Sequence, residues 1–203
     1  MADVLAASPE LRTLILLGVD IITGHDNVSS FSPITLSKLE VLSVQSAHKN
    51  PFVTLFPIVA PTSSELSLKV SSKALGEDPE ASISFFERSS ITDLCVEASY
   101  SSPSVRCLAA IKSLQSLSID FGLMEKEKTG SILDDLILAG SENWVNLRTL
   151  TLSSGTCSVQ AIKAVLRKIP VETLTLRRIQ DSSIKRLKRH LAPLVEKLII
   201  LSD

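Results

Sequence analysis

A short phrase, apolar-x-x-Leu-x-apolar, returns eight times along this chain of 203 residues. The third copy has a serine in the first position. The central leucines lie 28, 24, 28, 23, 33, 24 and 24 residues apart. Apolar and polar residues alternate within each phrase, as in a strand with one buried face. The copies are Leu11/Leu14/Leu16, Leu39/Leu42/Val44, Ser63/Leu66/Leu68, Ile91/Leu94/Val96, Leu114/Leu117/Ile119, Leu147/Leu150/Leu152, Val171/Leu174/Leu176 and Val195/Leu198/Ile200. The sequence therefore predicts eight short strands.

The segments between the phrases have the apolar spacing of helices. The clearest stripes are Val159, Ile162, Leu166 and Ile169, and then Ile184, Leu187, Leu191 and Leu194. Strands that are joined through helices run parallel, because the helix supplies the crossover. We therefore expect an α/β fold with a parallel sheet on a concave side and helices on a convex side.

Three helices are predicted to begin at the same signal, a capping side chain directly before a proline. The pairs are Asn50-Pro51, Asp78-Pro79 and Ser102-Pro103. Asn, Asp or Ser can accept a bond from a free N–H of the first turn, and proline at the first helical position loses no needed donor. The charged stretch 124–130 is predicted as a solvated loop before a helix over about residues 131–139.

With these phrases laid out, the chain resembles the leucine-rich repeat superfamily from about Leu11 to Ile200. Its long, helix-bearing repeats look most like the ribonuclease-inhibitor-like and F-box-associated members. The resemblance implies a single solenoid domain over residues 1–203, a horseshoe of about eight strand-helix repeats. It further implies a non-enzymatic protein-binding module, in the F-box group one that selects substrates for a cullin-type ubiquitin ligase.

The chain departs from the family pattern at the turns and at the ends. The family usually places Asn or Cys three residues after the last apolar residue of the strand phrase. At those positions this chain has Val19, Ala47, Ser71, Ser99, Gly122, Gly155, Ile179 and Asp203. The backbone groups of these turns therefore need other partners. No F-box segment precedes the first phrase. We expect either a fragment of a longer protein, or ends that are covered by a partner or by self-association.

A candidate protein-binding site follows from the strand residues that alternate with the leucines. Its middle is acidic, which favours a basic patch or peptide as the partner. The alternative is an ordinary solvated strand surface. The candidate residues are Glu65, Lys69, Asp93, Glu97, Asp120, Thr151, Thr175 and Arg177. The strand residues Ile15, Leu17, Ile199 and Leu201 are apolar instead, and they predict contacts with a partner or with a flanking segment.

Charge is concentrated toward the C-terminus. Residues 163–197 hold ten lysines and arginines against three acidic residues, a net charge of +7 in a chain of net charge −1. The candidate patch on the convex side is Lys163, Arg167, Lys168, Lys185, Arg186, Lys188 and Arg189, with Ile184, Leu187 and Leu191 turned inward. It could contact an acidic protein or nucleic acid, or be a solvated helix face. Aromatic residues, which single-strand nucleic-acid binding usually needs, are not interleaved, and this favours the solvated helix face.

Other chemistry finds little support in the sequence. The three cysteines include no Cys-x-x-Cys pair, and carboxylates beside Cys95 disfavour its thiolate. His25, His48 and His190 belong to separate repeats. We expect no enzyme, metal or cofactor. The N-terminus has no basic segment before an apolar run, which predicts neither secretion nor membrane insertion and favours a cytoplasmic or nuclear protein.

The expected function is thus substrate recognition like that of the F-box/leucine-rich-repeat proteins. Two alternatives stay open. One is a stand-alone scaffold or inhibitor that grips a basic protein. The other is an electrostatic nucleic-acid binder that uses the basic C-terminal helices.

Overall fold

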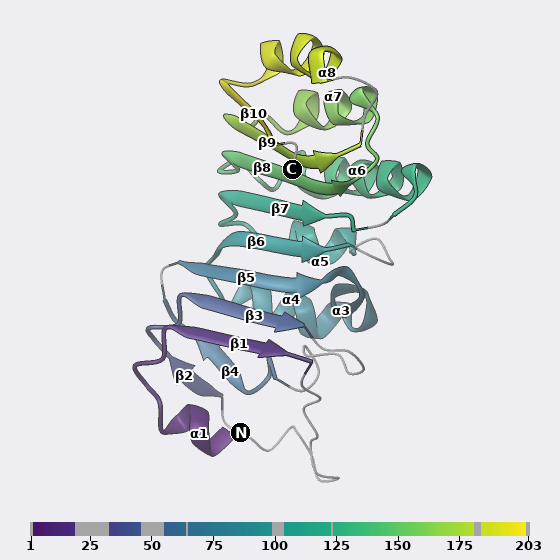
Figure 1. Cartoon of the computed structure of the whole chain (residues 1–203). Coiled ribbons are helices and arrows are strands. Elements are labelled where there is room, and N and C mark those ends of the chain that lie inside the picture. The colour runs from purple at the N-terminus through teal and green to yellow at the C-terminus, as the bar shows by residue number, and fades with distance from the viewer. Residues whose placement is uncertain are drawn as a thin grey trace.

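The computed structural model describes residues 2–18, 33–45, 55–63, 65–98, 104–122, 124–180 and 184–201. Its main feature is one sheet of eight parallel strands in the order β1-β3-β5-β6-β7-β8-β9-β10 (Figure 1). The strands are β1 (Thr13–Leu17), β3 (Val41–Gln45), β5 (Leu66–Ser71), β6 (Ile91–Glu97), β7 (Ser116–Asp120), β8 (Thr149–Gly155), β9 (Thr173–Ile179) and β10 (Lys197–Leu201). Each contains the Leu-x-apolar part of one of the predicted phrases, and the expected α/β class and parallel sheet are confirmed.

The two faces of this sheet differ in burial. In β5, Leu66, Leu68 and Val70 are fully buried, whereas the alternating Ser67 and Lys69 are half-buried. The leucine face packs against the helices in one hydrophobic core that runs along the sheet. We call the opposite face, on which the polar strand residues lie, the open face.

Helices follow the leucine face of the sheet on one side (Figure 1). They are α3 (Ser72–Glu77), α4 (Pro79–Glu87), α5 (Val105–Ala109), α6 (Lys126–Gly140), α7 (Val159–Lys168) and α8 (Ile184–Leu191), with a 3-10 turn, η2 (Ala192–Leu194), after α8. From α4 to α8, each helix packs beside the next. A short helix, α1 (Ala2–Ala6), precedes the first strand of the sheet.

The Asp-Pro helix start is confirmed at α4. Asp78 caps the helix by accepting a hydrogen bond from Ala81 N at 3.0 Å, and Pro79 is the first helical residue. The Asn50-Pro51 and Ser102-Pro103 pairs lie outside the described residues. Helix α5 begins at Val105, and Ser104 occupies the capping position before it.

The charged stretch is helical rather than a loop, and this prediction was wrong. Helix α6 begins at Lys126, five residues earlier than expected. The Glu125 carbonyl accepts from Thr129 N at 3.0 Å and from Thr129 Oγ1 at 3.1 Å, which starts the helix. Thr129 is fully buried while its charged neighbours are exposed, so this turn has an inner and an outer side like the rest of α6.

A second, two-stranded parallel sheet was not predicted. It pairs β2 (Ile34–Leu36) with β4 (Val59–Pro61). Both strands are short and lack the recurring phrase, so no periodic signal marks them. Next to them, Phe56 stacks on Phe85 of α4 with ring centroids 4.3 Å apart, and Arg88 donates to the Phe56 carbonyl.

The turns without asparagine bond to one another through the backbone. Gly18 N donates to Gln45 O at 2.8 Å and Ala98 N to Asp120 O at 2.8 Å. Phe121 N donates to Ser153 O at 2.9 Å in the same way. Each turn thus uses a carbonyl at or near the end of the neighbouring strand, and in this way these turns satisfy donors that a side-chain ladder could have served.

Candidate binding face of the sheet

Strand register arranges the open face in rows. The middle row contains Lys69, Cys95 and Ser118, which are direct cross-strand neighbours, followed by Thr151 and Thr175. The row toward the strand ends contains Ser71, Glu97, Asp120, Ser153 and Arg177. The row toward the strand starts contains Ser67, Asp93, Ser116, Thr149 and Thr173. Because parallel strands keep this register, residues far apart in sequence become neighbours here.

Glu97 is the centre of a polar network. Lys69 Nζ lies 2.8 Å from Glu97 Oε1, and Gln45 Nε2 from β3 donates to the same oxygen. The hydrogen bond to Glu97 raises the pKa of Lys69, and the charges of Glu97 and Asp120 add to it, although burial works in the opposite direction. Three strands therefore meet at one carboxylate.

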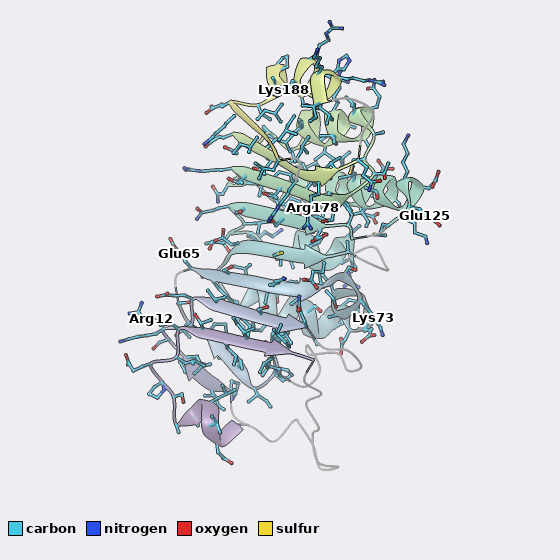
Figure 2. All side chains as sticks on the ribbon, in the orientation of Figure 1. Arg12, Glu65, Lys73, Glu125, Arg178 and Lys188 are labelled. Carbon is cyan, nitrogen blue, oxygen red and sulfur yellow. The ribbon has the colours of Figure 1, made fainter. Side chains whose placement is uncertain are left out.

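The other three predicted acidic residues do not all lie beside Glu97. Asp120 is the direct neighbour of Glu97 in the row toward the strand ends, and its Oδ1 accepts from Gly122 N at 2.9 Å. Asp93 accepts from Thr92 Oγ1 at 2.8 Å and belongs to the row toward the strand starts. Glu65 lies just before β5, on the side of the sheet where the strands begin (Figure 2), apart from this group.

The structure thus brings together Lys69, Glu97 and Asp120. Thr151 and Thr175 are half-buried on β8 and β9, and Arg177 is exposed at the same row as Asp120. Gln45 belongs to this group as much as any charged residue. Its place at the end of a strand phrase predicts that Gln45 lies on this face, but no local pattern pairs it with Glu97.

Cys95 lies in the middle of the open face, between Lys69 and Ser118. Burial raises the pKa of its thiol, Lys69 lowers it, and Glu97 and Asp120 raise it again. The predicted direction is right, but burial rather than the carboxylates is the main cause. Cys95 is therefore a poor thiolate nucleophile at neutral pH.

The predicted basic patch lies on the last two helices. Arg167 and Lys168 are exposed on α7, where Lys163 is half-buried. On α8, Lys185, Arg186, Lys188 and Arg189 are all exposed, and none of the four forms an ion pair among the described residues. Figure 2 shows Lys188 at α8, at the C-terminal end of the row of helices.

One part of the α8 prediction was wrong. Leu187 and Leu191 are buried as expected, but Ile184 is 46% exposed. Helix α8 is the last in the row, and within the described chain its main contacts are with α7, the short turn η2 and β10. Its first turn therefore has too few neighbours to bury an isoleucine.

Beside the start of α7 lies a depression of about 640 Å³. Lys126 from α6 and Arg186 from α8 line it, together with Ser158 and Gln180. Ser158 is already used as the cap of α7, since its Oγ accepts from Ala161 N at 3.0 Å. The depression extends the cationic surface of α8 toward α6.

Among the described residues, no cluster of His, Cys, Asp and Glu could hold a metal ion. His190 is half-buried on α8, and His25 and His48 fall outside those residues. No described helix has the length and apolar content that crossing a membrane requires. No family model, curated protein or solved structure matches the chain.

Proposed function

We propose that this chain is a leucine-rich-repeat-like solenoid that binds a protein partner on the open face of its sheet, without catalysing a reaction. One observation carries the proposal. Parallel sheets are usually covered by helices on both faces. Here the described helices follow one face, and the other carries half-buried Ser, Thr and charged side chains across the middle strands.

The surface favours a partner segment with a positive charge near its centre. Asp93 and Asp120 form no ion pair within the described chain, whereas Glu97 is held by Lys69. A lysine or arginine of the partner could pair with either of these carboxylates, which lie near the Lys69–Glu97 ion pair. The serines and threonines of β7 and β8 add donors and acceptors around them.

The matched test is charge reversal on and off this face. Asp93→Lys with Asp120→Lys should weaken capture of the main partner at least tenfold, since both partner-facing carboxylates become cationic. Glu142→Lys, at an exposed residue after α6, changes charge away from the open face and should leave capture unchanged. Equal capture of the partner by the wild type, the Asp93→Lys and Asp120→Lys double variant and Glu142→Lys would contradict the proposal.

The resemblance to F-box-associated repeats supports a specific role, recognition of a protein that is then ubiquitylated. The measurement is the lifetime of the captured partner in cells with and without this protein. A longer lifetime without it, restored by the wild type but not by the Asp93→Lys and Asp120→Lys variant, would support substrate recognition. An unchanged lifetime would favour a scaffold or inhibitor.

The exposed cations of α8 support a second candidate, contact with nucleic acid. Lys188 and Arg189 lie in the last turn of that helix, where positive charge is also favourable for the helix itself. Phosphate contact would give RNA binding that falls steeply with salt. Binding that is unaffected by salt, or by Lys185→Ser with Lys188→Ser, would exclude this candidate.

A further inference from the structure

The two end strands of the sheet leave the core partly open. The inward residues of the inner strands are buried. Leu68 and Val70, for example, have no exposed surface. The corresponding residues of the end strands, Leu14 and Leu16 in β1 and Leu198 and Ile200 in β10, are only half-buried. Both ends of the core therefore lack a covering layer within the described chain.

The end strands also differ from the rest on the open face. Across the inner strands this face is mainly polar, but β1 presents Ile15 at 55% exposure and Leu17 at 60%. On β10, Leu201 is 44% exposed and Ile199 is half-buried. Apolar pairs thus lie at both edges of one otherwise polar surface, a pattern that favours contact at the edges.

The register of the sheet makes these two edges complementary. In β1, Thr13 is the neighbour of Val41, and the same row ends at Lys197 in β10. If another β1 continued the sheet beyond β10 in this register, Ile15 would lie beside Ile199 and Leu17 beside Leu201. All strands are parallel, so this addition also places the helices of both molecules on the same side.

The charges that precede the strands match as well. Arg12 pairs with Glu40 at 2.7 Å, and Arg148 pairs with Glu172 at 3.9 Å, each across neighbouring strands. Glu196, the residue before β10, lies beside Glu172, the residue before β9. It forms no ion pair among the described residues. The same register would bring Arg12 of the added strand beside Glu196.

We propose that the β10 edge of one molecule binds the β1 edge of a second copy of this chain, in parallel and in register. The contact is head-to-tail, so each molecule keeps one unused edge and assembly continues beyond the dimer. It uses residues other than those of the proposed partner site.

The test exploits this head-to-tail geometry. Wild-type protein should form species larger than dimers as its concentration rises in sedimentation velocity experiments. Leu17→Lys blocks the β1 edge and Leu201→Lys blocks the β10 edge, and each variant alone should stay monomeric. An equimolar mixture has one intact edge of each kind and should form a dimer and nothing larger.

Three outcomes would overturn the proposal. Wild-type protein that stays monomeric at every concentration would mean that something else, such as another part of a longer chain, covers these edges. A dimer that does not grow would mean a two-fold contact. A mixture that stays monomeric, when wild type assembles, would mean that assembly uses another surface.

Cross-linking gives a readout that does not depend on the lysine variants folding. Neighbouring parallel strands lie about 4.8 Å apart, which suits a disulfide. In a Cys95→Ser background, Ile15→Cys mixed with Ile199→Cys should give a cross-linked dimer that neither forms alone. A yield no higher than that of Ile15→Cys with Gln160→Cys, on α7, would contradict the proposed register.

Discussion

Gly140 lies against the indole ring of Trp144, so closely that a Cβ added at Gly140 would stand 2.4 Å from Cε3 of that ring. Trp144 is buried, and its Nε1 donates to the Leu108 carbonyl at 3.2 Å. The end of α6 is thereby fixed to the end of α5. This contact anchors the longest spacing between two phrases, the 33-residue one.

Two glycines of the same helix should respond to alanine with opposite signs. Gly140→Ala should lower the free energy of unfolding by about 1–3 kcal/mol, because the indole and Ile169 leave no room. Gly130→Ala, with nothing within 4 Å of its added Cβ, should raise it by about 0.5–1 kcal/mol. Urea unfolding measures both. Destabilisation of equal size at both positions would show that α6 is packed differently.

The cap of α4 should contribute measurably to stability. Asp78→Ala removes the acceptor for Ala81 N and should lower the free energy of unfolding by about 1 kcal/mol. Asp78→Asn keeps an acceptor oxygen and should recover most of the loss. If Asn were as destabilising as Ala in thermal and urea unfolding, the hydrogen bond would not be the cause.

The Lys69–Glu97 pair should give a stability difference that depends on pH. Folding raises the pKa of Lys69, so its contribution is complete below the unfolded lysine pKa of about 10.4 and disappears as pH rises through the folded value. Because the side chains are 41% and 30% exposed, Lys69→Met should cost under about 1 kcal/mol at pH 7.

Urea unfolding of wild type and Lys69→Met at several pH values between 7 and 11 checks this. The difference between the two proteins should shrink as the pH approaches 11. A matched control is Lys73→Met, which removes the more exposed Lys73–Glu77 pair at 3.4 Å and should have a smaller effect at pH 7. A difference for Lys69→Met that grows with pH would contradict the assignment.

The three thiols should differ in reactivity. Cys107 and Cys157 are 0% and 2% exposed, so a disulfide reagent should reach only Cys95 in the folded protein. Burial raises the pKa of Cys95, so its reaction should be slow at pH 7 and increase at higher pH than for an unfolded thiol.

Lys69→Met should slow the Cys95 reaction further, because Lys69 is the group that lowers the pKa of this thiol. Cys95→Ser should abolish the reaction of the native state. Rapid modification of two or three thiols before unfolding would show that the core around Cys107 or Cys157 is open.

The strands and the order of the parallel sheet were predictable because their signal is local. A residue such as Leu174 is buried while its neighbours Thr173 and Thr175 are not, and this alternation is visible in five residues. The crossover rule then converts a series of strands and helices into a parallel sheet. The short strands β2 and β4 carry no such alternation over enough residues to be recognised.

The sequence by itself therefore determined which residues face the core and which could face a partner, since backbone geometry assigns sides by period alone. Only the tertiary structure decided which of those residues meet. Glu97 looked like one member of an acidic centre, yet register places Lys69 and Gln45, from two other strands, on its carboxylate. The exposure of Ile184 likewise depends on how many elements pack around the last helix, and no local pattern contains that information.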